Sequence, residues 1–274
     1  MFHASVIISV YNRFDYLSLV FAGLERQSLW DFEVVIADDG SDESFVDQLK
    51  NITPRLSFPL IHVRQDDKGF RKNKILNKAI VAANSDYLIF IDGDCVPHSE
   101  FLNEHSKYRK NNVCLTGRRV NLSEKITGQL SYELVRKGFL EREKFKLISD
   151  SLFGKSAYVE KGFYVKNEFL RTLLNKKIRG LLGCNFSAFK EDLLRINGFD
   201  ERYEAPSIGE DSDIQYRLEL AGTKIRSLNN IAIQYHLYHT LQDRPQKNLD
   251  LFNEIKAEGR AFTLYGIKNQ KSHR

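Results

Sequence analysis

The chain has 274 residues, of which 42% are apolar, with five prolines and 16 glycines. This is enough for one large globular domain, and the composition excludes disordered, collagen-like and low-complexity proteins. Lysine and arginine exceed aspartate and glutamate by 41 − 36 = 5, a mild excess that alone indicates no nucleic-acid partner. The three cysteines show no C-x-x-C spacing, so neither a disulfide framework nor a cysteine zinc site is expected, and a reducing compartment is the default.

The first twelve residues contain a short apolar run that includes His3 and Ser9. Arg13 follows without a small-residue cleavage pattern, so the run predicts a strand rather than a signal peptide. No stretch approaches the roughly 18 uninterrupted apolar residues that a membrane-spanning helix needs. We therefore expect a cytoplasmic protein that touches the inner face of the membrane at most peripherally.

Strands and helices alternate along the first 120 residues. Residues 6–10 form a β-branched run typical of a strand buried on both faces, and a helical stripe follows from Asn12 onward. The same alternation predicts strands at 32–37, 59–63 and 87–91 and helices at 44–50 and 72–83. Such alternation indicates an α/β fold with a mainly parallel sheet covered by helices on both faces. Ligands of these sheets bind beyond the carboxyl ends of the strands, where this chain places Tyr11, Asp38, Asp39, Asp92 and Asp94.

Basic residues gather in the middle of the chain, where periodicity weakens. Residues 121–179 contain 13 lysines and arginines against seven acids, a local excess of 13 − 7 = 6 that exceeds the excess of the whole chain. Order resumes at 180–199, followed by a helix at 211–221, a strand at 231–235 and a helical tail from 249 to 265. We expect one domain: a nucleotide-binding half (1–120), a basic helical excursion (121–180), an acceptor-binding and catalytic half (181–240) and a helical tail (241–274).

The tripeptide Asp92-Gly93-Asp94 ends the strand predicted at 87–91. On an extended backbone the two carboxylates point to the same side, and Gly93 leaves room between them for a divalent cation that carries a diphosphate. A polar turn after a buried strand is the alternative. Asp38-Asp39-Gly40-Ser41, after the neighbouring strand, is likewise either a turn closed by an Asx hydrogen bond or a pair of acceptors for a base N–H and ribose hydroxyls.

These motifs carry a family resemblance. In order and spacing, the segments 5–13, 34–41 and 91–94 resemble the three successive signatures of family 2 glycosyltransferases with the GT-A fold. Farther along, the segments 182–188, 196–203 and 209–213 resemble the carboxyl-terminal half of bacterial polysaccharide polymerases and animal β-1,4-galactosyltransferases. The resemblance spans roughly residues 4–240 and rests on the whole set of motifs, since each one alone is common.

The resemblance implies a nucleotide-sugar site at the strand ends. In such enzymes the backbone around Tyr11 and the acid matching Asp39 hold uracil, and the acids matching Asp92 and Asp94 hold the ribose and a Mn²⁺ or Mg²⁺ ion. The segment 70–77 looks like a stretch whose cations face the nucleotide-sugar, although a solvated helix face is the alternative for each cation. The expected nucleotide-binding residues are Val10, Tyr11, Arg13, Asp38, Asp39, Arg71, Lys72, Lys74 and Asp92.

The acids at 210–213 carry the expected chemistry. An inverting transfer needs a carboxylate to take the proton from the attacking hydroxyl, and the base of the family aligns with Asp211. Glu210 and Asn185 would then bind the acceptor. The alternative is a run of acids that caps the following helix.

His236 follows a predicted strand, where the family often places a histidine that completes the metal site beside Asp94. His239 is a further candidate ligand. A structural role is the alternative for either histidine.

One departure from the family concerns the acceptor. The related galactosyltransferases carry Trp-Gly-Trp-Gly before the acidic pair, whereas this chain has Glu204-Ala205-Pro206-Ser207-Ile208-Gly209. Acceptor identity therefore does not carry over. The aromatic residues within 121–179 predict either a solvated excursion or a surface for a lipid-linked, anionic acceptor and the membrane that holds it.

The function expected from this set is that of a metal-dependent, inverting glycosyltransferase. It would move a sugar from a nucleotide diphosphate, with UDP as the expected nucleotide, to a hydroxyl of a glycan or lipid-linked glycan during cell-surface polysaccharide or lipopolysaccharide synthesis. A non-catalytic nucleotide-sugar or glycan-binding module on the same fold is the alternative, although this chain keeps every acid that the reaction needs. A nucleic-acid partner is not expected, because the chain outside 121–179 is near neutral and carries no recognition motif.

Overall fold

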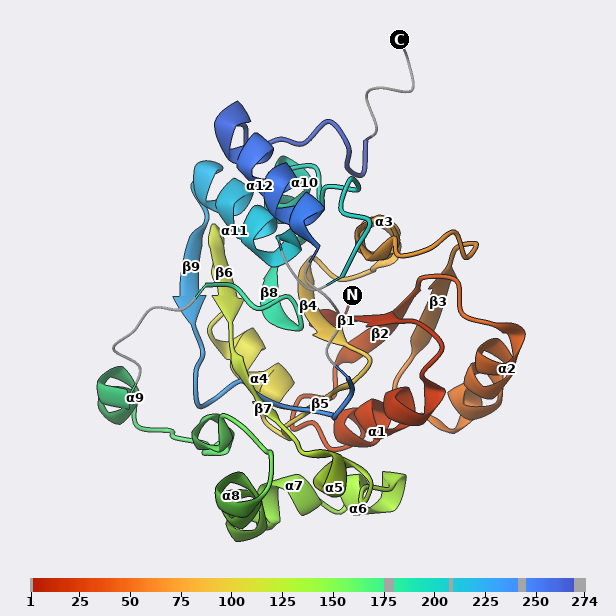
Figure 1. Cartoon of the computed structure of the whole chain (residues 1–274), viewed down its shortest axis with the longest axis vertical. Coiled ribbons are helices and arrows are strands. Elements are labelled where there is room, and N and C mark those ends of the chain that lie inside the picture. The colour runs from red at the N-terminus through yellow and green to blue at the C-terminus, as the bar shows by residue number, and fades with distance from the viewer. Residues whose placement is uncertain (1, 175–179, 207–208, 241–244, 269–274) are drawn as a thin grey trace.

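The apolar runs predicted as strands form the centre of a seven-stranded sheet (Figure 1). The computed structural model describes residues 2–174, 180–206, 209–240 and 245–268. The order of the strands is β3-β2-β1-β4-β8-β6-β9. Neighbours are parallel except where β8 pairs with β4 and β6, so the predicted mainly parallel α/β sheet is confirmed. The bounds are β1 Ala4–Val10, β2 Phe32–Asp38, β3 Leu60–Arg64, β4 Tyr87–Asp92, β6 Val113–Thr116, β8 Asn185–Phe189 and β9 Lys224–Ser227.

The two faces of this sheet are covered by different helices. Successive side chains of a strand point to opposite faces, so Val6 and Ile8 pack into one core cluster and Ile7 into the other. The first cluster includes residues of α1 (Phe14–Leu24), α2 (Glu43–Ile52) and α4 (Phe101–Lys107). The second includes residues of α3 (Lys72–Ala82), α10 (Lys190–Arg195) and α11 (Glu210–Leu220). A short 3-10 turn, η1 (Thr53–Arg55), continues from α2.

A second sheet of three strands lies beside the first and has the order β5-β10-β7. Its strands are β5 (Cys95–Pro97), β7 (Arg118–Asn121) and β10 (Ile233–His236). In its register His236 lies opposite Cys95 on one side and Asn121 on the other. This pairing brings β10, late in the sequence, to the turn that follows β4.

Short helices make up most of the basic middle region, which lies at the lower edge of the view in Figure 1. They are α5 (Glu124–Thr127), α6 (Tyr132–Arg136), α7 (Phe139–Arg142), α8 (Lys144–Phe153), the 3-10 turn η2 (Val159–Gly162) and α9 (Glu168–Leu174). Among the described residues, no helix combines the length and apolarity needed to cross a bilayer.

The helical tail is shorter than the sequence predicts. Its helix, α12, spans Gln246–Glu258 rather than continuing to residue 265. Gly259 ends it in the left-handed region at φ 61°, a conformation that glycine adopts at little cost. The outer parts of the predicted tail, 241–244 and 269–274, lie outside the described residues.

Candidate active site

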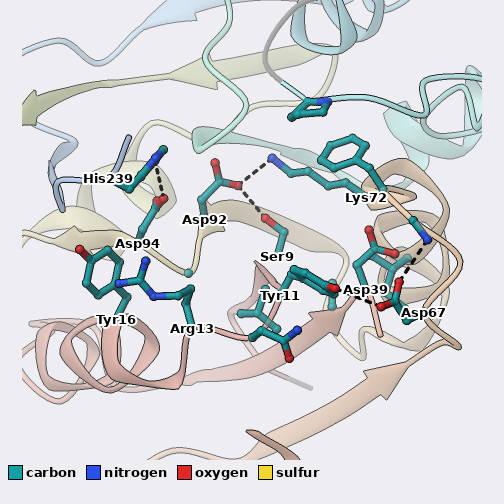
Figure 2. Close-up of a pocket in the computed structure, with 18 of the residues that line it drawn as sticks. Ser9, Tyr11, Arg13, Tyr16, Asp39, Asp67, Lys72, Asp92, Asp94 and His239 are labelled. Atoms are coloured by element: carbon teal, nitrogen blue, oxygen red, sulfur yellow. Dashed lines mark hydrogen bonds and ion pairs between the residues drawn. The ribbon is translucent and has the colours of Figure 1, made fainter. Parts of the chain in front are cut away.

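A cavity of about 770 Å³ opens at the carboxyl ends of β1, β2 and β4. It is lined by Val10, Tyr11 and Arg13 after β1, by Asp39 after β2, by Lys72 at the start of α3, and by Asp92 and Asp94 at the end of β4. Figure 2 labels all of these side chains except that of Val10 and shows them converging from separate elements. The architecture thus brings together the residues that follow the strands, as parallel α/β sheets do.

At one end of the cavity, neutral donors hold the carboxylate of Asp39. The Gln65 side-chain amide donates to Oδ1 at 2.6 Å, and the backbone N–H of Arg71 donates to Oδ2 at 2.7 Å. Burial raises the pKa of Asp39, and these hydrogen bonds only partly offset that effect. Nearby, the half-exposed Tyr11 donates its hydroxyl to Asp67 Oδ2 at 3.0 Å. We call this region, around Tyr11, Asp39 and Asp67, the nucleoside end.

Asp38, adjacent in sequence, does not face the cavity. Its carboxylate is fully buried, where it accepts from the Ser41 backbone N–H at 2.8 Å and lies 2.9 Å from His62 Nε2. Burial alone would raise the pKa of Asp38, but the hydrogen bonds from His62 and Ser41 hold that pKa below its ordinary value. The carboxylate therefore closes the Asp38–Ser41 turn, and its predicted role in nucleotide binding has no support in this geometry.

The basic residues at the start of α3 also differ in whether they face the cavity. Arg71 uses its guanidinium to donate to the backbone carbonyl of Asp66. Neither Arg71 nor Lys74 lines the cavity, whereas Lys72 does. Arg13 also lines it, with its guanidinium paired to Asp15 and stacked 3.6 Å above the Tyr16 ring. Lys72 and Arg13 are therefore the cations placed to meet an anionic ligand in the cavity.

Lys72 joins the end of β4 to the beginning of α11. Its Nζ lies 2.9 Å from Asp92 Oδ1 and 3.6 Å from Glu210 Oε1. Asp92 also accepts from the Ser9 hydroxyl at 2.6 Å. Burial of the Glu210 carboxyl, together with its acidic neighbours, raises the pKa of Glu210 to about 7 despite the Lys72 charge. We call this region, around Lys72, Asp92, Asp94, Glu210 and Asp211, the acidic end.

Asp211 is held by a glycine that the sequence analysis did not single out. The backbone N–H of Gly183 donates to Asp211 Oδ2 at 2.8 Å, and a Cβ at position 183 would lie 2.0 Å from Oδ1. A residue with a side chain would therefore push the carboxylate away. Burial raises the pKa of Asp211, and Lys72 and the Gly183 hydrogen bond oppose that effect. Asp211 directly follows Glu210, whose carboxylate lies 3.6 Å from Lys72 Nζ, so Asp211 lies near the Lys72–Asp92 pair.

The glycine at position 93 has a packing role that the sequence analysis did not predict. A Cβ there would lie 2.9 Å from Val10 Cγ1 and 3.1 Å from the Ser9 carbonyl oxygen, and the Gly93 N–H donates to that oxygen at 2.9 Å. The glycine therefore lets the ends of β1 and β4 approach each other. The space that a Cβ would take is filled by protein, but Gly93 itself lines the cavity, so the expectation that it leaves room for a ligand stays a prediction.

Two histidines converge on Asp94. Asp94 Oδ2 lies 3.4 Å from His236 Nε2 and 3.3 Å from His239 Nε2, and the two Nε2 atoms are 3.1 Å apart. The Cys95 thiol donates to Asp94 Oδ1 at 3.3 Å. Burial would raise the pKa of Asp94, but hydrogen bonds from the histidines hold that pKa well below its ordinary value. One carboxylate oxygen and two imidazole nitrogens at this spacing fit a divalent transition metal such as Mn²⁺.

Asn185 lies beneath the site rather than in it. Its amide nitrogen donates to the carbonyls of Arg118 and Ala232, and its amide oxygen accepts from the Gly117 N–H. The side chain is fully buried and does not line the cavity. Asn185 therefore ties β8 to its neighbours, and its predicted contact with an acceptor has no support in this geometry.

Comparison with known proteins identifies the family. The model of "Glycosyl transferase family 2" matches residues 5–164, more than half of the chain, and that of "N-terminal domain of galactosyltransferase" matches residues 167–240. The chain belongs to glycosyltransferase family 2 and is a glycosyltransferase.

Its relatives include polysaccharide synthases. The chain is 27% identical over 268 residues to chondroitin synthase of Escherichia coli, covering 95% of this chain and 37% of that protein. It is 25% identical over 268 residues to hyaluronan synthase of Pasteurella multocida, covering 95% of this chain and 26% of that protein. The chain thus spans only about a quarter to a third of the length of these synthases.

Solved structures agree on the GT-A fold. TarS of Staphylococcus aureus, residues 1–349 in complex with UDP-GlcNAc, superposes with a TM-score of 0.62 at 18% identity, covering 94% of this chain and 66% of that one. A mannosyltransferase from Pyrobaculum calidifontis in complex with GDP-Man and Mn²⁺ superposes with a TM-score of 0.56 at 12% identity, covering 94% of this chain and 69% of that one.

Proposed function

We propose that this glycosyltransferase moves a sugar from a UDP-sugar to a hydroxyl of a growing cell-surface polysaccharide or lipopolysaccharide, with inversion at the anomeric carbon. The observation that carries the proposal is the bridge formed by Lys72, because it links Asp92 at the end of β4 to Glu210 at the start of α11. Glu210 and Asp211 do not themselves line the cavity, and this link supports placing the candidate base on α11 next to the donor cavity.

The nucleoside end suits the base and ribose of the donor. Tyr11 offers a half-exposed ring for stacking, and Asp39 and Asp67 offer carboxylate oxygens as acceptors. A cavity of about 770 Å³ is within the range of pockets that bury a ligand of nucleotide-sugar size. The UDP-GlcNAc complex of TarS supports UDP as the nucleotide.

Asp94, His236 and His239 would hold the divalent cation. When bound, such an ion neutralises charge on the diphosphate as the bond to the sugar breaks. Asp92 would accept from the ribose, and Lys72 would add positive charge at the same end of the cavity.

Asp211 would act as the base. In the transfer, the acceptor oxygen forms a bond to the anomeric carbon, the bond from that carbon to the diphosphate oxygen breaks, and the acceptor proton moves to Asp211. Burial raises the pKa of this carboxyl, which makes it a stronger proton acceptor than an exposed aspartate. Glu210, beside it on α11, would accept a hydrogen bond from the acceptor sugar.

A donor screen tests the proposal. The chain is incubated with a panel of UDP-sugars, a mixed glycan acceptor and Mn²⁺, and release of UDP is measured; the configuration of the product is read by NMR. We expect one donor to be turned over, an inverted linkage, and loss of turnover with EDTA and in Asp94→Asn. Full activity in EDTA would overturn the metal assignment, and a retained configuration would overturn the role of Asp211.

We also propose that the acceptor is lipid-linked and that α8 and α9 touch an anionic membrane. Phe145 and Phe153 on α8 are 87% and 89% exposed, and Phe169 on α9 is 71% exposed. Lys144 and Lys146 are the sequence neighbours of Phe145 on α8. Exposed apolar side chains among lysines favour the interface of an anionic bilayer.

Flotation with vesicles of phosphatidylserine and phosphatidylcholine tests this contact. We expect the chain to float with them at low salt and the double variant Phe145→Ser, Phe153→Ser to lose most of the binding. Trp30→Ser is the control, because Trp30 is 63% exposed but lies outside this region. Equal flotation of the double variant would overturn the contact.

A further inference from the structure

Arg119 lies on the face of the small sheet that carries His236. On β7, Arg119 is paired with Gln234 and Asn121 with His236, so these side chains share one face. Val120 and Tyr235, one residue along each strand, point the other way into the hydrophobic core. The alternation of the strand therefore directs Arg119 toward the candidate metal ligands rather than into the core.

The Arg119 guanidinium contacts two sulfur atoms. Its Nη1 donates to Cys184 Sγ at 3.3 Å and to Cys95 Sγ at 3.9 Å. Cys95 directly follows Asp94, and Cys184 directly follows Gly183, the residue that holds Asp211. Arg119 thus lies between the segment that carries the candidate metal ligand and the segment that positions the candidate base.

In the part of the chain that the structure describes, the charge of Arg119 has no close counter-charge. Among the residues that the structure describes, the guanidinium makes no ion pair, and its hydrogen bonds end on thiol sulfurs, which are weak acceptors. Asp92, Asp94 and Asp211 act on it only at longer range. A largely buried guanidinium without a paired anion is costly, and its planar fork is suited to a pair of oxyanion oxygens.

We propose that Arg119 binds an oxyanion of the donor substrate between Asp94 and Asp211. Arg119 is not among the residues that line the cavity, but its contacts with Cys95 and Cys184 place it next to the segments that carry both acids. The proposal rests on the proposed function. In the proposed function the bond that breaks lies between these two acids, so the diphosphate of the leaving nucleotide would come within reach of Arg119. A carboxylate on the transferred sugar has the same chemistry and is the other source of such an oxyanion.

Calorimetric titration in Mn²⁺ distinguishes the two sources. Four ligands are compared, namely UMP, UDP, UDP-glucose and UDP-glucuronate, with the wild type, Arg119→Gln and Arg119→Lys. The matched control is Arg118→Gln, on the same strand but pointing to the opposite face, where its Nη2 donates to the Gly180 carbonyl. The thermal midpoint of each variant without ligand separates a loss of folding from a loss of binding.

If the diphosphate is the ligand, Arg119→Gln weakens UDP about tenfold relative to the wild type and leaves UMP unchanged, with a smaller effect in Arg119→Lys. If the sugar carboxylate is the ligand, the variant weakens UDP-glucuronate and leaves UDP and UDP-glucose unchanged. Equal affinities of wild type and both variants for all four ligands would overturn the inference, as would a lower thermal midpoint with no ligand-selective change. Failure of the wild type to bind UDP at all would instead overturn the proposed function.

Discussion

The nucleoside end and the acidic end of the cavity hold their carboxylates by different means. Asp39 is held by the Gln65 amide and a backbone N–H, both neutral donors. Around Asp92, by contrast, charged groups lie close together, because Lys72 bridges it to Glu210 and two histidines converge on the nearby Asp94. Neutral donors fix a geometry for recognition at the nucleoside end. At the acidic end, burial and the acidic neighbours together raise the pKa of Glu210 to about 7, within the range that acid–base chemistry requires.

The contrast extends to what each end can tolerate. At the acidic end a Cβ at position 183 would displace the Asp211 carboxylate, and a small displacement there has a direct chemical cost. At the nucleoside end, binding depends on several separate hydrogen bonds and a half-exposed ring, so no one change should abolish it. Mutations at the acidic end should therefore affect turnover, and those at the nucleoside end affinity.

Asp211→Asn should have the largest effect. The amide keeps the shape of the side chain but cannot take the proton of the acceptor, so turnover should fall about 10²–10⁴-fold while the affinity for UDP stays within about twofold. UDP release and calorimetry measure the two quantities. Ser212→Ala, at the next and exposed position of α11, is the control and should be fully active. Wild-type turnover in Asp211→Asn would show that Asp211 is not the base, and the assignment of the chemistry to the acidic end would then be wrong.

Gly183→Ala should have the next largest effect. The new Cβ would lie 2.0 Å from Asp211 Oδ1, so the carboxylate must move and turnover should fall about 10–100-fold with the affinity for UDP retained. Gly128→Ala is the matched control, because the nearest atom to its Cβ is a carbonyl oxygen at 3.3 Å and Gly128, at the end of α5, does not line the cavity. If both variants retain the same turnover, the position of Asp211 does not depend on Gly183.

Variants of the adjacent acids Asp38 and Asp39 test which of the two contributes to nucleotide binding at the nucleoside end. Asp39→Asn should weaken UDP about tenfold, because one carboxylate acceptor in the cavity is lost. Asp38→Asn should leave the affinity for UDP unchanged and lower the free energy of unfolding by about 1–3 kcal/mol, because a buried carboxylate paired to His62 and the Ser41 N–H is disrupted. Urea denaturation and calorimetry check both. An effect of Asp38→Asn on affinity alone would contradict this division.

The fold was predictable because its signals are local. Runs such as residues 6–10 are apolar and β-branched, and the helices between them show clear stripes, so the sheet and its ligand-binding edge follow from pattern alone. The end of α12 was missed because the apolar pattern continues past Gly259, where the backbone turns left-handed.

The site was predictable only in part. Asp38 and Asp39 are chemically identical neighbours, and only the path of the turn decides which of them faces the cavity. Asn185 belongs to a motif but is satisfied within the core, and its side-chain direction is not a sequence property. Arg119 was missed because its proximity to Asp94 depends on the pairing of β7 with β10, across more than 100 residues of chain.

The smallest expected effect is a dependence of stability on pH. The pKa of Glu210 is raised from 4.5 to about 7 in the folded chain, so between these values the folded chain keeps a proton that the unfolded chain has lost. Stability from this group is therefore full below the unfolded pKa and is lost as pH rises through about 7. Glu210→Gln removes this titration. Between pH 5 and pH 8 the free energy of unfolding should therefore fall by about 1–2 kcal/mol less in the variant than in the wild type. Urea denaturation across this range checks it, with the exposed Glu219→Gln on the same helix as control. Parallel pH profiles for the wild type and Glu210→Gln would mean that Lys72 fully offsets the burial of this carboxyl, so that its pKa is not raised in the folded chain.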